Sequence, residues 1–257
     1  MDHRRRVLTW LPLAAAAADM AWAAPPTSTS TPALRLKAVT IGVAPYGMRG
    51  ADGGASGLLV EVIAALAARS GIAIDNVVVP YPRAMAMMAS GEADLLMSIA
   101  NSRLVSVARP VALVFEGDVV AVGRAGSRYA RLADLRGKVV AHIRGVEYNA
   151  AFEADLQIRK YETSSIEQSL KMLLERRVDA AVGSRESLLY AMRAMGRSRE
   201  QLGAPMAIGH IYIRMYLSYR IKDGAATDAL VGAMDALRDD GAVAKLRAGY
   251  FTGPPTQ

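Results

Sequence analysis

The pattern of apolar and polar residues in the first half of the chain alternates between the two-residue period of strands and the longer period of helices. Alternating or β-branched runs predict strands over residues 36–44, 74–79 and 95–99. Apolar residues at helical spacing predict helices over residues 58–70 and 82–89, followed by Gly71 and Gly91 as helix-ending glycines. This order of elements is typical of a parallel sheet covered by helices.

The same pattern restarts after residue 132. It predicts strands over residues 139–143 and 178–182, and helices over residues 148–156 and from Ser164 onward. Ser164 and Glu167 have the spacing of a capping box. The segments ASGEADLLMS and LERRVDAAVGS share a helix end, an acidic turn, an apolar strand and a serine. Asp94 and Asp179 begin the two strands, where we expect each carboxylate to accept hydrogen bonds from turn backbone.

Two long extended segments interrupt the pattern. Residues 111–122 and 210–221 are each too long for a simple buried strand, and we interpret them as crossings between domains. A final helical region over 228–246, with a break at Gly241, returns the chain to the first domain. The sequence therefore predicts an α/β protein of two lobes, each a mostly parallel sheet flanked by helices. The expected boundaries are 36–112 and 216–257 for lobe 1 and 113–215 for lobe 2, with hinge segments near 112–117 and 211–215.

The N-terminus has the pattern of a targeting segment. Three arginines, Arg4 to Arg6, precede an apolar run over 7–18, and Ala21-Trp22-Ala23 forms a small-x-small cleavage site. We expect a signal peptide over residues 1–23 that is cleaved on export to the periplasm, by either the general or the twin-arginine route. A polar, flexible spacer is expected over residues 24–35. An uncleaved anchor or a buried helix is the alternative for the apolar run.

Composition narrows the possible chemistry. The chain has 257 residues, of which 52% are hydrophobic, and a formal net charge of +7 from dispersed basic residues. No basic run is interleaved with aromatic residues, so we expect no nucleic-acid partner. The chain contains no cysteine, which excludes thiol catalysis and thiolate metal sites. The three histidines have no metal-ligand spacing, and neither a metal nor a cofactor is predicted.

Six segments, in order, resemble the family 3 extracellular solute-binding proteins, the amino-acid-type receptors of ABC importers. The matching segments are GLLVEVIAALAARSGI, RAMAMMASGEADLLMS, Arg103 with Pro110 beyond it, LADLRGKVVAHIRG, LKMLLERRVDAAVGS and YLSYRIKDG…ALRDDGAVAKLRAGYF. They span nearly the whole chain after the leader. The resemblance implies a two-lobe periplasmic-binding-protein fold, type II-like, that acts as a monomer. It also implies a small polar or anionic solute, an amino acid or related carboxylate, bound in the cleft and delivered to an inner-membrane ABC permease.

The resemblance also suggests binding residues. Arg103 lies where the family keeps an arginine for the ligand carboxylate, and a guanidinium matches a carboxylate in a bidentate manner. Ser98 and Asn101 lead toward it from the predicted strand, and Tyr46 lies where the family places an aromatic lid. The other candidates are Arg83, Gly145 and Ser184. A surface location for the two arginines, a packed loop tyrosine and a plain turn glycine remain the alternatives.

Ser184 departs from the family pattern. Members that bind α-amino acids have an aspartate near this point for the ammonium group, and a serine hydroxyl does not neutralise that charge. Two rival functions follow from the same fold. One is an exported dehydratase-like enzyme, for which Glu147 and Glu186 are the candidate acids. The other is a sensor or partner-binding module that signals through a membrane protein.

Overall fold

The computed structural model describes residues 34–50 and 53–252. The described residues belong to one compact unit. The predicted signal peptide and all but the end of the predicted spacer lie outside the described residues. No helix of the described part combines the length and the hydropathy that a membrane span needs.

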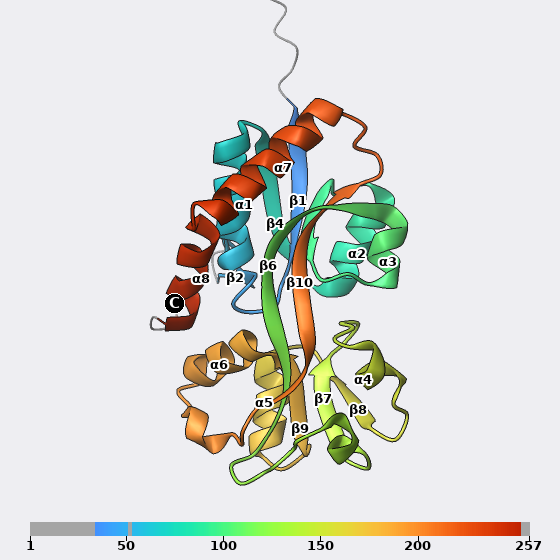
Figure 1. Cartoon of the computed structure of the whole chain (residues 1–257), viewed down its shortest axis with the longest axis vertical. Coiled ribbons are helices and arrows are strands. Elements are labelled where there is room, and N and C mark those ends of the chain that lie inside the picture. The colour runs from blue at the N-terminus through green and yellow to red at the C-terminus, as the bar shows by residue number, and fades with distance from the viewer. Residues whose placement is uncertain (1–33, 51–52, 253–257) are drawn as a thin grey trace, which may run out of the picture. The chain divides into compact units, whose positions relative to one another are not determined.

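Eight strands form one hydrogen-bonded sheet (Figure 1). Its spatial order is β4 (Ala73–Val79), β1 (Arg35–Ile41), β5 (Leu95–Ser98), β10 (Met206–Ser218), β6 (Ala108–Gly123), β9 (Ala180–Ser184), β7 (Val139–Ile143) and β8 (Arg159–Thr163). The strands at each end are parallel to their neighbours, whereas the central pair, β10 and β6, runs antiparallel. A small hairpin of β2 (Met48–Arg49) and β3 (Ala55–Ser56) lies outside this sheet.

The two central strands divide the sheet into two halves. β10 pairs with β5 over 214–217, whereas β6 pairs with β9 over 119–123. Between these regions β6 and β10 pair with each other, for example Gly117 with Ile211. We call the half with β4, β1 and β5 lobe 1 and the half with β9, β7 and β8 lobe 2. The sequence predicted a separate sheet for each lobe, and this was wrong in one respect, because the long strands β6 and β10 join the strands of both lobes into one sheet.

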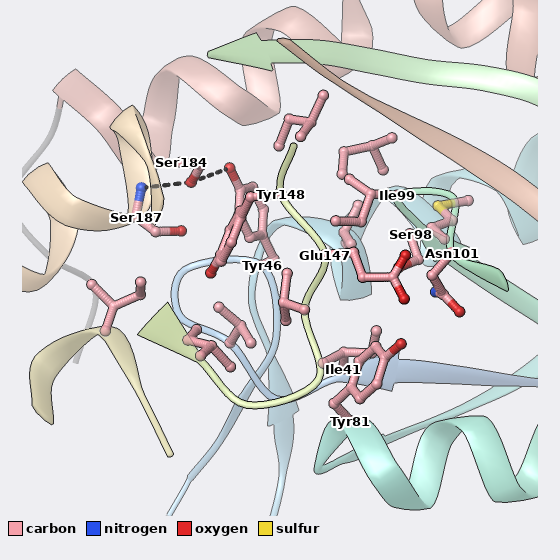
Figure 2. A pocket seen from close by; sticks show the side chains of 18 residues that line it. Ile41, Tyr46, Tyr81, Ser98, Ile99, Asn101, Glu147, Tyr148, Ser184 and Ser187 are labelled. Carbon is pink, nitrogen blue, oxygen red and sulfur yellow. Dashed lines mark hydrogen bonds between the residues drawn. The ribbon is translucent and has the colours of Figure 1, made fainter. Parts of the chain in front are cut away.

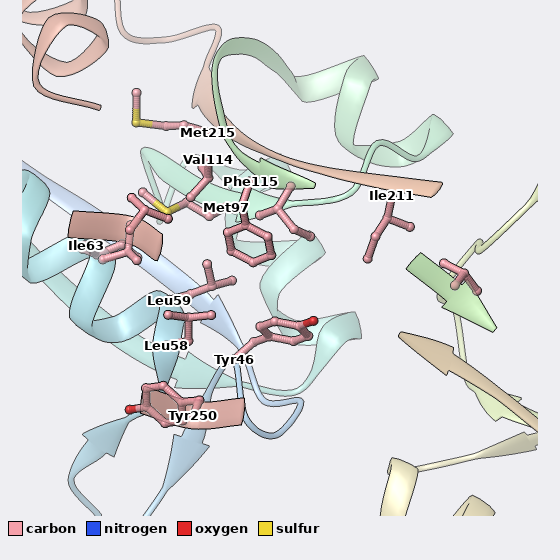
Figure 3. Close-up of a cluster of buried hydrophobic side chains, with 14 of the residues drawn as sticks. Tyr46, Leu58, Leu59, Ile63, Met97, Val114, Phe115, Ile211, Met215 and Tyr250 are labelled. Carbon is pink, nitrogen blue, oxygen red and sulfur yellow. The ribbon is translucent and has the colours of Figure 1, made fainter. Parts of the chain in front are cut away.

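Lobe 1 is covered by α1 (Leu58–Ser70), α2 (Tyr81–Ser90), α3 (Ser102–Val107), α7 (Gly224–Asp239) and α8 (Ala242–Thr252). The predicted inward face of α1 is buried, and Leu59 and Ile63 pack near Met97 and Phe115 of the sheet (Figure 3). Removing side chains of this size from water stabilises a fold by about 1.5–3 kcal/mol each. Gly71 ends α1 with a positive φ of 71°, as predicted.

Lobe 2 is covered by α4 (Ala150–Ala154), α5 (Ile166–Leu174) and α6 (Arg185–Ala194), with short 3₁₀ turns η1 (Leu132–Leu135) and η2 (Arg199–Gln201). The apolar stripe of α5, which includes Ile166 and Leu170, packs with Leu188 of α6 and with Val120 of β6. The predicted capping box was wrong by one residue. Ser165, not Ser164, caps α5 by accepting a hydrogen bond from the backbone N–H of Gln168 at 3.1 Å.

The same contact between an aspartate and the backbone of a neighbouring strand occurs in both lobes. Oδ2 of Asp94 accepts a hydrogen bond from the N–H of Lys37 at 2.9 Å, and its own N–H donates to the Lys37 carbonyl. In lobe 2, Oδ2 of Asp179 accepts from the N–H of Val139 at 2.8 Å, and its N–H donates to the Val139 carbonyl. Both aspartates accept backbone hydrogen bonds, as predicted, but their partners belong to the neighbouring strands β1 and β7 and not to a turn. Each aspartate ties its own strand to the start of the neighbouring parallel strand.

Candidate functional site

A cavity of about 90 Å³ lies between the two lobes. Lobe 1 contributes side chains such as Ile41 and Ser98, and lobe 2 contributes Ile143 and Ser184. Ile211 and Ile213 of β10 complete the wall where β6 and β10 pair with each other. A cavity lined by both lobes and by the strands that join them changes shape whenever the lobes move, which is what a ligand-operated clamp requires.

Hydroxyl groups gather at one end of this cavity. The Tyr46 hydroxyl lies 3.0 Å from Oγ of Ser184, and that oxygen also accepts the backbone N–H of Ser187 at 3.1 Å (Figure 2). Ser184 ends β9 and is the N-cap of α6, so the strand passes directly into the helix. A loop of lobe 1 is thereby bonded to the first turn of a lobe 2 helix.

Tyr46 also takes part in an ionic group behind the cavity. Its hydroxyl lies 3.1 Å from Oε2 of Glu186, and Glu186 forms an ion pair with Arg247 of α8. Burial raises the pKa of the Tyr46 phenol well above its usual range, and the nearby Glu186 carboxylate adds to the shift. The tyrosine therefore stays protonated well above neutral pH and donates its hydrogen bond to Ser184 or Glu186. The Arg247 guanidinium also stacks on the Phe115 ring at 4.8 Å.

The other end of the cavity is formed by the loop that follows β5. Asn101 caps α3, because its Oδ1 accepts the backbone N–H of Leu104 at 2.9 Å. Asn101 lines the cavity, and its Nδ2 group is buried and has no hydrogen-bond partner. Ser98, also buried, lies beside it in Figure 2. The polar residues at this strand end therefore cap a helix and leave one amide donor unsatisfied.

Glu147 projects into the same end of the cavity from the loop after β7 (Figure 2). The hydroxyl of Tyr81 faces it. Burial raises the pKa of Tyr81, and the charge of Glu147 raises it further, whereas the charge of Arg103 lowers it. An acidic and a basic side chain therefore both act on this hydroxyl. Glu147 is among the residues that line the cavity and Arg103 is not.

The seven sequence-predicted binding residues fall into two groups. The structure brings Tyr46, Ser98, Asn101 and Ser184 together on the cavity wall. Arg103 is exposed in the first turn of α3, near Tyr81. Arg83 forms a surface ion pair with Glu92 at 2.7 Å.

Gly145 lies just outside the cavity wall but close to lobe 1. It has a positive φ of 75°, and a Cβ built there lies 3.0 Å from two ring carbons of Tyr81. The loop after β7 therefore packs directly on the lobe 1 tyrosine. A larger residue at this position needs both an unfavourable backbone conformation and a shift of the ring.

The sequence analysis did not predict most of the residues that line the cavity. Apart from its polar ends, the wall consists of aliphatic and aromatic side chains, among them Val43, Ile99, Val146 and Ile166. Ser187 and Tyr148 were also not predicted, and Glu147 was named only as an acid for the enzyme alternative. The alternation of apolar residues in each strand marks them as buried, but it does not say which of them face a cavity.

The chain matches the model of the bacterial extracellular solute-binding proteins, family 3, over residues 37–253. It belongs to this family. The match spans both lobes and both central strands. Among the described residues, no group of three or more histidine, cysteine, aspartate or glutamate side chains is placed to hold a metal ion. No match to a curated protein was found.

Solved structures of this fold include both a periplasmic binding protein and a sensor domain. A periplasmic His/Glu/Gln/Arg/opine family-binding protein from Silicibacter pomeroyi, in complex with lysine, has a TM-score of 0.68 at 16% identity, covering 86% of this chain and 99% of that one. A histidine kinase sensor domain with similarity to periplasmic binding proteins has a TM-score of 0.72 at 20% identity. The match covers 85% of this chain and 96% of that one. The BvgS VFT2 domain from Bordetella pertussis has a TM-score of 0.70 at 18% identity, and the match covers 84% of this chain and 93% of that one. At these identities the likeness shows the two-lobe fold and does not identify a ligand.

Proposed function

We propose that this family 3 protein captures a small solute between its two lobes in the periplasm and presents the closed form to a membrane partner. The observation that carries the proposal is the cavity whose wall comes from lobe 1, lobe 2 and β10 together. A solute held there contacts both lobes at once. It therefore favours the closed arrangement by its difference in affinity for the two states, and no bond is made or broken.

The partner we propose first is an ABC permease, for which the family membership and the predicted leader over residues 1–23 provide the support. The specific observation that favours a sensory partner is the fold likeness to a histidine kinase sensor domain and to the BvgS VFT2 domain. In both cases the chain reports occupancy of the cavity by closing. The enzyme alternative loses support, because Glu186 is engaged by Arg247 and Glu147 is exposed at the cavity's edge.

A thermal-shift screen tests the binding function. The chain is heated with amino acids, dicarboxylates, amines and small neutral solutes, and a solute that binds the native state raises the melting temperature by mass action. Binding in the cavity predicts that Ile143→Trp, which fills the cavity from lobe 2, abolishes the shift. The matched substitution Leu156→Trp, at a fully exposed lobe 2 position, leaves the shift unchanged. A shift that survives Ile143→Trp in a folded variant contradicts the proposed site.

Uptake measurements separate the two partners. Cells that lack the chain lose accumulation of the labelled solute if the partner is a permease. They retain accumulation but lose solute-dependent transcription if the partner is a sensor kinase.

A further inference from the structure

Helix α6 of lobe 2 lies against α8 of lobe 1 (Figure 1). The guanidinium of Arg193, in the last turn of α6, donates hydrogen bonds to the backbone carbonyls of Tyr250 at 2.7 Å and Phe251 at 2.6 Å. Both carbonyls belong to the last turn of α8, where carbonyl groups have no partners within the helix. The helix dipole also favours a positive charge at this end. An arginine of one lobe therefore caps a helix of the other.

Three further contacts join α6 to lobe 1. The Glu186 carboxylate, in the first turn of α6, forms its ion pair with Arg247 of α8. The hydroxyl of Tyr190, a buried residue in the middle of α6, donates to Sδ of Met48 at 3.3 Å. The N-cap of α6 is bonded to Tyr46. We call these three contacts, together with the arginine cap on α8, the α6 latch.

The α6 latch lies on the same side of the central strands as the cavity. Gly117 of β6 pairs with Ile211 of β10, and directly paired residues of antiparallel strands face the same side of a sheet. Ile211 lines the cavity. A Cβ built on Gly117 lies 3.6 Å from Oε2 of Glu186 and 3.7 Å from a guanidinium nitrogen of Arg247. Opening of the cavity by rotation about these strands therefore moves α6 and α8 apart.

A second region of the boundary between the lobes lacks such contacts. A groove of about 870 Å³ separates residues 78–82 of lobe 1 from residues 161–168 of lobe 2. In the described part of the chain, no hydrogen bond or ion pair joins these two segments. Tyr81, Ile143 and Ile166 line both the groove and the cavity. The groove therefore leads to the cavity, whereas the latch holds the lobes together at α6.

We propose that the α6 latch biases the two lobes toward the closed arrangement before a solute binds. This inference rests on the proposed binding function and adds a regulation to it. A solute that binds the closed state has an apparent dissociation constant equal to its intrinsic value divided by the closed fraction. The latch therefore raises the apparent affinity of the cavity without touching the solute. Entry takes place through the groove, during the openings that the latch permits.

Single-molecule energy transfer in the absence of any solute tests the latch. Labels on Ala86→Cys in α2 and Lys171→Cys in α5, both at exposed positions, report the distance between the lobes. Arg193→Met removes the bonds to the end of α8, and we expect the ratio of open to closed molecules to rise by about tenfold. Arg197→Met, at an exposed arginine just after α6, is the matched control and leaves the ratio unchanged.

Two more variants test the latch independently of Arg193→Met. Arg247→Met removes the ion pair with Glu186 and is expected to raise the ratio of open to closed molecules as well. Arg193→Lys keeps a positive charge near the end of α8 but loses the paired donors of the guanidinium, so its ratio is expected to lie between those of the parent chain and Arg193→Met. Circular dichroism of each variant shows that it is folded before its distances are compared.

The opposite results overturn the inference. These are a ratio that stays at the parent value in both Arg193→Met and Arg247→Met, or an equal rise in Arg197→Met. A smaller open fraction in the two latch variants also overturns it, because the contacts would then stabilise the open arrangement. The proposed binding function fails on a different result, a thermal-shift screen that finds no solute of any class, so the two failures are distinguishable.

Discussion

The hydroxyl of Tyr46 and Oγ of Ser184 lie 3.0 Å apart across the two lobes. Tyr46 belongs to the loop after β1 in lobe 1, and Ser184 is the point where β9 becomes α6 in lobe 2. Ser184 also stands where the family resemblance suggested an aspartate for a ligand ammonium. A tyrosine of the chain itself therefore binds the residue that was expected to hold the solute, and the lobes contact each other through their own polar groups.

Removal of the Tyr46 hydroxyl is expected to weaken this contact. Tyr46→Phe keeps the buried ring but loses the interactions with Ser184 and Glu186, so the free energy of unfolding falls by about 1 kcal/mol. Urea denaturation of both proteins measures the change. Tyr212→Phe, at an exposed tyrosine, serves as the control and is expected to change stability little. Equal stabilities of the Tyr46 variant and the parent chain disagree with a bond between the lobes.

The ion pair of Glu186 with Arg247 connects α6 to α8 and is expected to be coupled to folding. Both side chains are mostly buried, with 19% and 27% of their surfaces exposed, so solvent screens the pair only in part. A double-mutant cycle with Glu186→Gln and Arg247→Met is expected to give a coupling energy of about 1–2 kcal/mol. The exposed pair of Arg35 with Asp75 provides the comparison, with a coupling below about 1 kcal/mol. Coupling energies of the same size at both pairs contradict the special role of the buried one.

The two strand-start aspartates are expected to matter equally. Asp94→Ala and Asp179→Ala each remove a carboxylate that accepts a backbone N–H at the start of a parallel strand. Hydrogen bonds to charged groups contribute about 1.5–3 kcal/mol, so each variant loses roughly that much unfolding free energy. Asp239→Ala, in the exposed last turn of α7, tests for a general effect of removing negative charge and should be near neutral. A loss confined to one of the two strand-start variants is inconsistent with a device repeated in both lobes.

Protonation of His142 is expected to destabilise the fold in mild acid. Burial lowers the pKa of this β7 histidine below its ordinary value of 6.5, while the charges of Glu153 and Glu162 act in the opposite sense. Below about pH 6.5 the unfolded chain therefore binds a proton that the native chain binds only at lower pH. Stability is thus higher above this pH and falls as the pH drops, by at most about 1.4 kcal/mol per pH unit.

Melting temperatures at pH 7.5 and pH 5.5 check this effect. The parent chain and His210→Gln, at an exposed histidine, are expected to lose stability between the two values, and His142→Gln is expected to lose less. An undiminished loss in His142→Gln assigns the pH dependence to other groups.

The strongly periodic elements could be predicted from sequence, because one face of each is buried in a single core. The helix over 58–70 and the strand over 139–143 have the predicted bounds. β8, with the sequence RKYET, was missed, since it is an edge strand whose side chains are mostly polar and exposed. α6 was missed because it follows β9 without a turn, so that Ser184 serves as the last residue of the strand and as the cap of the helix.

The site was less predictable for a physical reason. Ser98 and Asn101 were suggested because polar residues follow an apolar strand, whereas Tyr46 and Ser184 were suggested by the family resemblance, and all four line the cavity. Glu147 lies in a loop without periodicity, and its position depends on how that loop packs on Tyr81 of the other lobe. Contacts between lobes depend on three-dimensional packing, which the spacing of residues along one chain does not encode.

The central claim is that a solute closes the two lobes on each other, and distance measurement between them tests it most directly. The chain has no cysteine of its own, so Ala86→Cys in α2 and Lys171→Cys in α5 place two fluorescent labels on exposed positions of lobe 1 and lobe 2. Single-molecule energy transfer is then recorded with and without the solute found in the thermal-shift screen. The account predicts a shift of the population toward the shorter distance at the concentration at which the solute binds. Saturation of the chain with no change in the distance distribution of the parent protein or of Tyr46→Phe contradicts it.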